Sequence, residues 1–148
     1  MAYKGKFKVT KPKKYGGDHT NVTYRSLWER QAFKWCEANP NIELWASEAL
    51  VIPYICETDN KQHKYYTDLQ IKWKDGSVTV VEIKPAKEMS PPDVTRRKSK
   101  GLLKEVFTYK KNISKWKYAT AYCVKQGWKF EIWNEHTLAA KGIKVLRK

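Results

Sequence analysis

Residues 65–85 read Tyr-Tyr-Thr-Asp-Leu-Gln-Ile-Lys-Trp-Lys-Asp-Gly-Ser-Val-Thr-Val-Val-Glu-Ile-Lys-Pro, and they contain two strand patterns separated by a turn. Over residues 63–73, side chains alternate between two faces as they do in a half-buried strand. A turn is expected at residues 74–76, followed by a second strand over residues 77–84, where Pro85 ends it. We therefore predict an antiparallel hairpin around this turn.

The length of the turn decides which residues of the hairpin face each other. A two-residue turn would place Asp68 opposite Ile83. A three-residue turn, with Gly76 left-handed in a bulge, would place Asp68 opposite Glu82 on the same face. The second register also sets apolar residues of the two strands against each other, so we predict that one.

Two ionisable residues interrupt the apolar second strand. Glu82 and Lys84 are two positions apart and therefore share one face. Carboxylates from adjacent strands, here Asp68 and Glu82, can jointly bind a hard cation such as Mg²⁺. A lysine beside such an ion would orient a water nucleophile and stabilise phosphate charge. An exposed, salt-bridged strand face with an incidental Asp68 would give the same pattern.

Glu29 is a fourth candidate, at the margin of the apolar stripe of a helix predicted over residues 23–38. From this position its side chain can reach over a sheet edge. The same residue also fits a capping box with Ser26 and an ion pair with Arg25 four positions earlier. Glu48 is another possible acid, although its surroundings favour a solvated turn.

The remaining elements are predicted from periodicity and from stop signals. Residues 86–100 read as an exposed loop that ends in a basic run. Two helices are expected after it, with Ser114 as the N-cap of the second and Gly127 just past its end. The elements, in a mixed α/β order, are strands at 42–46, 50–56 and 128–133 and helices at 102–111, 114–126 and 135–141.

Composition points to one domain that binds a polyanion. The chain has 148 residues and a net charge of +15, and residues 1–22 are Lys-rich without a sustained period. We predict a basic arm over 1–22, partly ordered at best, and a domain over 23–148. Nucleic acid is favoured over a membrane, because we find no membrane span, secretory signal or basic amphipathic helix.

The three cysteines, Cys36, Cys56 and Cys123, are odd in number and far apart in the sequence. They form no CxxC pair, and no histidine stands at zinc-finger spacing from them. We expect reduced and mostly buried thiols, and neither a disulfide framework nor structural zinc.

Five stretches of the sequence, taken together, resemble a known family. They are 24–29 (Tyr-Arg-Ser-Leu-Trp-Glu), 45–48 (Trp-Ala-Ser-Glu), 51–54 (Val-Ile-Pro-Tyr), 65–68 (Tyr-Tyr-Thr-Asp) and 81–85 (Val-Glu-Ile-Lys-Pro). In this order they resemble the head-completion nucleases of T4-type tailed phages, over nearly the whole chain. That family is similar to the PD-(D/E)XK nucleases, including phage Holliday-junction resolvases and the nuclease subunit of Tn7-like transposases.

The resemblance implies a fold and a set of catalytic residues. The fold is a single restriction-endonuclease-like α/β domain, a central mixed β-sheet flanked by helices. The implied catalytic residues are Glu29, Asp68, Glu82 and Lys84. Asp68, Glu82 and the Ile83 carbonyl would bind Mg²⁺ or Mn²⁺, with Glu29 supporting the metal site. The sequence departs from the superfamily pattern in having Thr67, rather than proline, before Asp68.

The function implied by the resemblance is metal-dependent hydrolysis of double-stranded DNA during completion of the phage head. Capsid or portal proteins would be partners, and the site of action would be the host cytoplasm or the virion. We expect the basic run Arg96, Arg97, Lys98 and Lys100 to contact DNA phosphates, with a merely solvated loop as the alternative.

Two other functions fit the same resemblance. One is a non-catalytic connector protein that holds DNA, which the four retained polar residues disfavour. The other is a recombination or transposon-end nuclease, which the lack of an added domain for a transposase partner disfavours.

Overall fold

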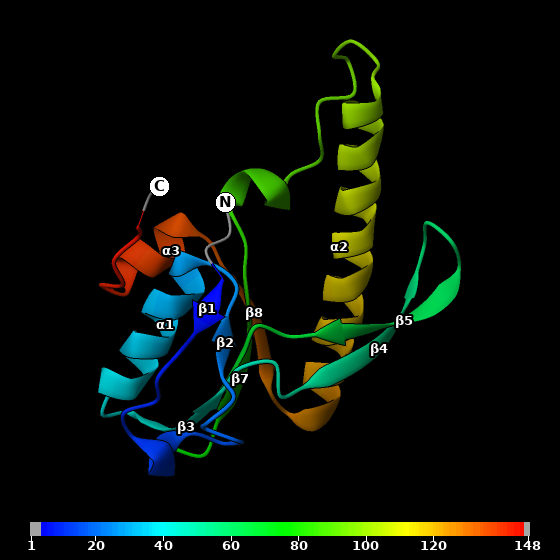
Figure 1. The fold of residues 1–148 in the computed structure, drawn as a ribbon. Helices are drawn as coiled ribbons and strands as arrows, with labels where there is room; N and C mark the ends of the chain where they lie inside the picture. The colour runs from blue at the N-terminus through cyan, green and yellow to red at the C-terminus, as the bar shows by residue number, and fades with distance from the viewer. Residues whose placement is uncertain (1–3, 147–148) are drawn as a thin grey trace.

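A computed structural model describes residues 4–146 of the chain. Its main sheet has four strands in the order β3-β6-β7-β8. The strands are β3 (Ile42–Ala46), β6 (Leu69–Trp73), β7 (Val78–Ile83) and β8 (Lys129–Trp133). Only β7 and β8 run parallel, so the sheet is mixed, as predicted. Two helices, α1 (Leu27–Ala38) and α3 (Glu135–Ala140), lie on one side of this sheet, and α2 (Lys100–Gln126) lies on the other (Figure 1).

The hairpin of β6 and β7 has the predicted register. Leu69 pairs with Val81, and the Trp73 N–H donates to the Ser77 carbonyl at 2.8 Å. Gly76 closes the turn with a φ of 91°, which is the left-handed conformation that a three-residue loop requires. This register brings the end of β7 alongside the residues that precede β6.

The prediction of one strand over residues 63–73 is wrong, because the chain changes partners at Thr67 and Asp68. Its first part is β5 (Lys61–Tyr66), which pairs only with β4 (Val51–Cys56) in a separate two-stranded sheet. At the switch, the Thr67 N–H donates to the Leu50 carbonyl at 3.2 Å. Alternation continues unbroken because both parts bury the same face, so periodicity alone does not reveal the switch.

Helix α1 begins later than residue 23, where the sequence predicted its start. Ser26 is its N-cap and accepts a hydrogen bond from the Glu29 N–H. The two preceding positions are extended as β2 (Thr23–Tyr24), which pairs with β1 (Gly5–Lys6). Tyr24 stands at helical spacing from the apolar residues of α1, although it lies in β2. The apolar period in the sequence is therefore longer than the helix.

Helix α2 is continuous where two helices were predicted. Ser99 caps its start, and Gly127 ends it with a φ of 77°. Ser114, the predicted cap of a second helix, instead donates from Oγ to the Lys110 carbonyl within the helix at 3.1 Å. A serine hydroxyl bonded in this way needs no helix end. The 3₁₀ turns are η1 (Pro12–Lys14) and η2 (Ala86–Met89), and η2 lies in the predicted loop after β7.

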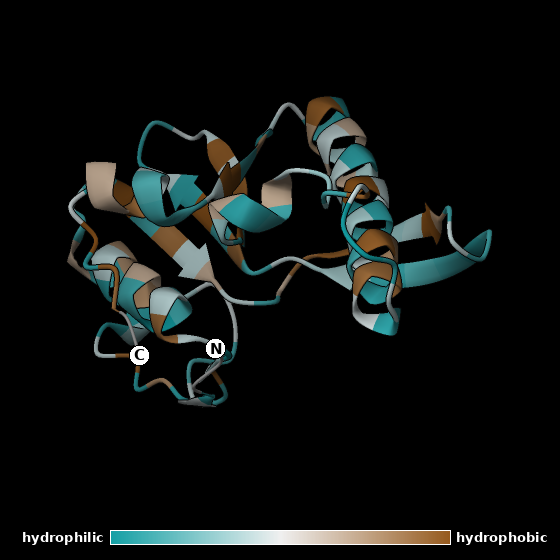
Figure 2. Cartoon of the chain, turned by 90° about the horizontal axis from the view of Figure 1, so that it is seen from above, coloured by the Kyte–Doolittle hydropathy of each residue, from teal (hydrophilic) through white to brown (hydrophobic). Residues whose placement is uncertain are grey.

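Residues 4–146 form two hydrophobic cores. The larger lies between the main sheet, α1 and α3, and the smaller lies between the β4–β5 hairpin and α2. Figure 2 shows hydrophobic residues on the main-sheet strands and a mixture of hydrophobic and hydrophilic residues along α2. The three cysteines are buried, as predicted. Within residues 4–146, no helix combines the length and the apolar character of a membrane span.

The N-terminal segment differs from the loosely ordered arm that the sequence suggested. Val9, Tyr15 and Val22 belong to the larger core, and Tyr15 stacks edge-on against Trp45 with ring centroids 4.7 Å apart. Single anchoring side chains hold this segment, so no helix or strand period marks it in the sequence. Residues 1–3 of the arm lie outside the described residues.

Candidate active site

Asp68 stands where β6 separates from β7. The last paired residue of β6 is Leu69, so the N–H of Ile83 has no strand partner on that side. The Asp68 carboxylate takes its place and accepts this N–H through Oδ2 at 2.7 Å. Asp68 therefore lies at its predicted position opposite Glu82, and its side chain takes the place of the backbone carbonyl that a continued strand pair would provide. This hydrogen bond fixes the Asp68 side chain at the point where β6 and β7 stop pairing.

The Glu82 carboxylate is fixed by three neighbours in the interior of the molecule. Its side chain points from β7 toward α2, and the residue is only 5% exposed. The Tyr65 hydroxyl donates to Oε1 at 2.7 Å, and the Trp116 indole N–H donates to Oε2 at 3.3 Å. Lys84 Nζ lies 3.8 Å from Oε2. The carboxylate is therefore almost fully buried, and both of its oxygens still accept hydrogen bonds.

Lys84 and Ile83 continue the end of β7 next to this carboxylate. The Lys84 side chain is 24% exposed, so its ammonium group is open to a ligand from solvent while it remains near Glu82. Its backbone N–H donates to the Trp133 carbonyl at 3.0 Å, which anchors the strand end to β8. The lysine is therefore positioned by strand pairing, and its ammonium group stays accessible.

Glu29 approaches from the first turn of α1. The expected cap is present, because Ser26 Oγ accepts the Glu29 N–H at 3.2 Å. The Glu29 carboxylate accepts the Arg25 backbone N–H at 3.1 Å. The ion pair with Arg25 that was the alternative interpretation of Glu29 does not form; the Arg25 guanidinium binds Glu48 instead, with two contacts of 3.1 Å. Glu48 sits at a strained φ of 52° and is the other acid that borders the site.

The predicted carboxylates of Glu29, Asp68 and Glu82, here called the acid cluster, influence one another electrostatically. Burial raises the pKa of Glu29 to about 7, and the charges of Glu48 and Glu82 add to this rise. Burial also raises the pKa of Asp68 well above its ordinary value, reinforced by Glu82 and then by Glu29. Like charges gathered in a place poor in water favour either bound protons or a bound cation.

The donor set fits a hard divalent ion held by few protein ligands. All of the candidate ligand atoms are oxygens, which Mg²⁺ and Mn²⁺ accept. Among residues 4–146, no group of three or more acidic, histidine or cysteine side chains is placed so that it could hold a metal ion. Mg²⁺ commonly binds to one or two carboxylates and keeps several waters, so two carboxylates and a backbone carbonyl suit it.

Sequence reasoning missed Tyr65, Trp116 and Lys115 as parts of the site. Alternation predicts that Tyr65 is buried but does not identify its partner. Burial raises the pKa of Tyr65, and the Glu82 charge raises it further, so the phenol stays a donor to that carboxylate. Trp116 and Lys115 lie on α2, and no sequence signal shows which strand a helix of this length faces.

The predicted DNA-binding residues lie away from the acid cluster. Arg96, Arg97, Lys98 and Lys100 are exposed at the far end of α2 from its contact with Glu82 (Figure 1). From Lys100 to Trp116 the helix spans about 24 Å. Arg96 is also engaged with Glu105 at 2.8 Å. These exposed side chains are therefore separated from the carboxylates by most of the length of α2.

The fold and site define a class of protein that sequence comparison also identifies. Residues 39–135, which carry Asp68, Glu82 and Lys84, match the family described as "TnsA-like endonuclease N terminal". The chain belongs to this family of endonucleases, whose fold is restriction-endonuclease-like.

A full-length relative extends the comparison beyond the matched domain. The chain is 40% identical to the "Head completion nuclease" of Enterobacteria phage T4. The similarity covers 97% of this chain and 99% of the relative. It therefore includes the N-terminal segment and Glu29, which lie before the family match.

Proposed function

We propose that this protein is a divalent-metal-dependent endonuclease that hydrolyses phosphodiester bonds of double-stranded DNA. The observation that carries the proposal is that burial and the charge of Glu82 raise the pKa values of Glu29 and Asp68, while the Lys84 ammonium lies 3.8 Å from Glu82. A bound Mg²⁺ or Mn²⁺ would lower the pKa of a coordinated water and offset phosphate charge. Asp68, Glu82 and the Ile83 carbonyl would hold the ion, and Glu29 would support them.

The residues of the chain have separate roles in this proposal. Tyr65 and Trp116 orient Glu82 through their hydrogen bonds to its two oxygens. The Ile83 N–H holds the Asp68 carboxylate in place. Lys84 orients the attacking water and stabilises the charge that develops on the phosphate. Preorganised groups of this kind need no rearrangement when the reaction occurs.

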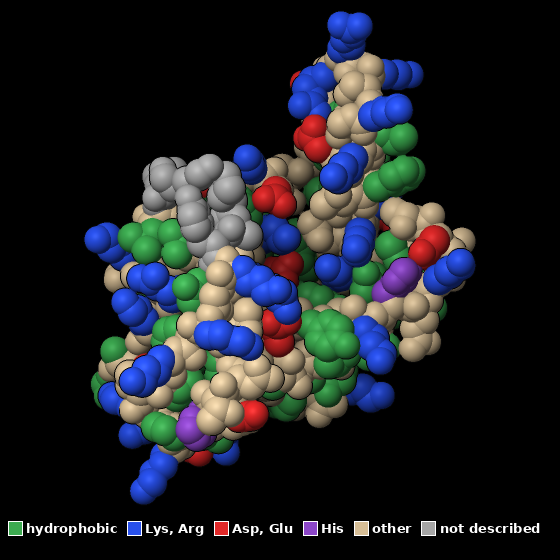
Figure 3. Space-filling model, in the orientation of Figure 1, with side chains coloured by type: hydrophobic (Ala, Val, Ile, Leu, Met, Phe, Trp, Pro, Cys, Tyr) green, Lys and Arg blue, Asp and Glu red, His purple; other side chains and the backbone are tan. Residues whose placement is uncertain are grey.

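The charge distribution suits a long polyanionic substrate. Figure 3 shows Lys and Arg side chains along the protruding helix α2 and over the adjacent body, with Asp and Glu side chains gathered between them. A net charge of +15 attracts DNA over distances at which the local acids have little effect. The positive surface would bind the phosphate backbone on both sides of the acidic site.

The biological setting is proposed from the relative. The phage T4 protein is named for head completion. We propose that this chain has the same role, acting after DNA packaging in the host cytoplasm and in contact with capsid or portal proteins.

A nicking assay on supercoiled plasmid tests the proposed chemistry. Cleavage is expected with Mg²⁺ or Mn²⁺, and EDTA should abolish it, because carboxylates alone do not activate water sufficiently. Glu82→Gln prepared in parallel controls for contaminating nucleases. Full activity in EDTA, or equal activity in the variant, would contradict the proposal.

Neutralising the basic run should weaken DNA binding and flatten its dependence on salt. Each phosphate contact that is lost lowers the slope of log affinity against log salt by about one unit. Replacing all four residues with Gln should therefore lower the slope by about three to four units. The measurement is fluorescence anisotropy with labelled duplex over a salt series.

A variant with equal charge loss elsewhere provides the control for this experiment. It carries Gln at the exposed positions Lys34, Lys64, Lys125 and Lys129. An equal change of slope in both variants would mean that only net charge matters and that the run is a solvated loop.

A further inference from the structure

Lys115 lies beside the acid cluster although it belongs to a different element from the predicted site residues. It precedes Trp116 on α2, and its ammonium nitrogen lies 5.3 Å from the centre of the Tyr65 ring. The hydroxyl of the same ring donates to Glu82. Lys115 is therefore one aromatic ring away from the carboxylate that Lys84 approaches along β7.

The ammonium group of Lys115 makes no ion pair or hydrogen bond within the part of the chain that the structure describes, although the charges of Glu82 and Asp68 act on it from farther away. It is half-buried, yet none of the ion pairs or hydrogen bonds among residues 4–146 includes it. A lysine ammonium has three donors, and removing it from water is unfavourable unless they are used. A contact with an aromatic face offsets only part of that cost. The ammonium group therefore has donors available to bind an anion.

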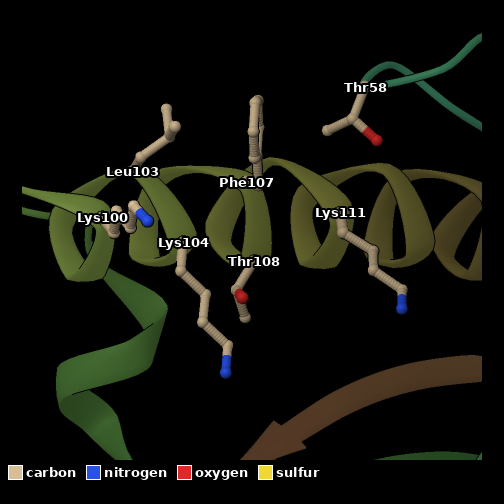
Figure 4. Close-up of a pocket in the computed structure, with 7 residues that line it drawn as sticks. All are labelled: Thr58, Lys100, Leu103, Lys104, Phe107, Thr108 and Lys111. Carbon is tan, nitrogen blue, oxygen red and sulfur yellow. The ribbon is translucent and has the colours of Figure 1, made fainter.

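Other lysines extend from Lys115 along one side of α2. Positions 104, 108, 111 and 115 follow the four-three-four spacing of one helical stripe. Lys104, Thr108 and Lys111 project to the same side of the helix, away from Leu103 and Phe107 (Figure 4). Lys111 is close enough to Lys115 to interact with it electrostatically. Four residues rise about 6 Å along a helix, which lets two such lysines reach successive phosphates of one strand.

We propose that Lys115 binds a backbone phosphate of the DNA strand at the acid cluster and that Lys111 binds the next phosphate outward along α2. The inference rests on the proposed nuclease function and adds a phosphate-binding site on a second element. The cleaved strand would lie between the end of β7 and α2, with Lys84 and Lys115 contacting it from different elements. The basic run beyond Lys100 would then bind the same DNA farther away.

A structural role for Lys115 makes different predictions. If the lysine only balances the charge of Glu82 and covers the Tyr65 ring, its replacement should lower thermal stability and leave the affinity for DNA unchanged. The two roles are separated by a measurement of DNA binding that does not depend on cleavage.

The test compares Lys115→Gln with Lys117→Gln, a replacement of an exposed lysine two positions later on the same helix. Binding of a labelled duplex is measured with Ca²⁺ in place of Mg²⁺ over a salt series. Lys115→Gln should bind about ten-fold more weakly and lose about one unit of salt slope, as expected for one phosphate contact. Lys117→Gln should match the wild type, and Lys115→Arg should recover most of the affinity.

Cleavage by these variants is then measured in single turnovers with Mg²⁺. Lys115→Gln should be about ten-fold to a hundred-fold slower, the usual effect of losing a charge-assisted contact. Lys115→Met retains the aliphatic stem over Tyr65 and replaces the Gln variant if the latter does not fold. Binding by the Lys115 variant equal to that of Lys117→Gln would overturn the proposal, whatever its cleavage rate. Absence of cleavage by the wild type would overturn the proposed function instead, and the binding comparison would still decide on Lys115.

Discussion

Asp68→Asn should reduce cleavage by about a thousand-fold or more while leaving the metal-free protein at least as stable as the wild type. The amide oxygen of Asn can still accept the Ile83 N–H that Asp68 Oδ2 accepts at 2.7 Å. The substitution also removes a carboxyl group that is costly to ionise. Burial raises the pKa of Asp68 well above its ordinary value, and the charges of Glu82 and Glu29 raise it further. Loss of the Asp68 charge relieves repulsion in the fold and removes a ligand from the proposed metal site.

Glu82→Gln should abolish cleavage equally but should not stabilise the fold. From the sequence alone, Asp68 and Glu82 would repel each other without metal, so both substitutions are expected to cost little stability or even to raise it. The structure separates them, because both Glu82 oxygens accept hydrogen bonds. The Gln amide oxygen can accept only one of these two donors, and an NH₂ group turned toward Tyr65 leaves the phenolic hydrogen without its acceptor. One lost buried bond of this kind costs about 1–2 kcal/mol.

Thermal melts in EDTA and nicking assays in Mg²⁺ on both variants test this pair of predictions. A purely structural role for the carboxylates predicts the opposite pattern: Asp68→Asn would lower the melting temperature, and any cleavage would survive. Such an outcome would remove Asp68 from the site.

The hairpin and its register could be predicted because local chemistry determines both. Gly76 alone supplies the left-handed turn, and the turn length fixes which residues of β6 and β7 pair. The placement of Asp68 near Glu82 follows from that register. The backbone N–H that Asp68 accepts could not be predicted, because it becomes free only where β6 leaves the sheet.

Contacts between distant segments could not be read from the sequence. The partner change at Thr67 depends on β4, and the hydrogen bond from Trp116 to Glu82 joins residues 34 positions apart. Periodicity reports which face of an element is buried and not what covers it. For the same reason Lys115 resembles any other lysine of α2 until the helix is placed against Tyr65.

Continuity of α2 depends on the use that Ser114 makes of its hydroxyl. Serine favours helix ends because its side chain competes for backbone groups. Here Oγ donates to the Lys110 carbonyl and accepts the Glu57 N–H at 3.3 Å, so the helix continues and is tied to the end of β4. The propensity of serine for helix ends therefore predicted a helix break at Ser114, where the structure has a contact between α2 and the residue after β4.

Glu29 should make the metal-free protein less stable as the pH rises from about 4.5 to about 7. Its pKa in the folded protein is raised from 4.5 to about 7 by burial, with Glu48 and Glu82 adding to the effect and Arg25 opposing it. Between these pH values the folded protein keeps the proton that the unfolded chain has lost. Unfolding then releases a proton, so stability falls with increasing pH in this window and levels off above it.

The size of this effect is isolated by comparing the wild type with Glu29→Gln, whose amide oxygen can still accept the Arg25 N–H. A pKa rise from 4.5 to about 7 corresponds to about 3 kcal/mol for a residue that is 8% exposed. Urea unfolding in EDTA at pH 4.5 and pH 7.5 should show the variant gaining about this much relative to the wild type at the higher pH.

Glu43→Gln, which alters an exposed glutamate that pairs with Lys72, should follow the wild type at both pH values. Mg²⁺ should stabilise the wild type more at pH 7.5 than at pH 4.5, because the ion competes with protons for the same carboxylates. A constant difference between wild type and Glu29→Gln across this range would show that folding leaves the pKa of Glu29 unchanged and that this residue does not belong to the acid cluster.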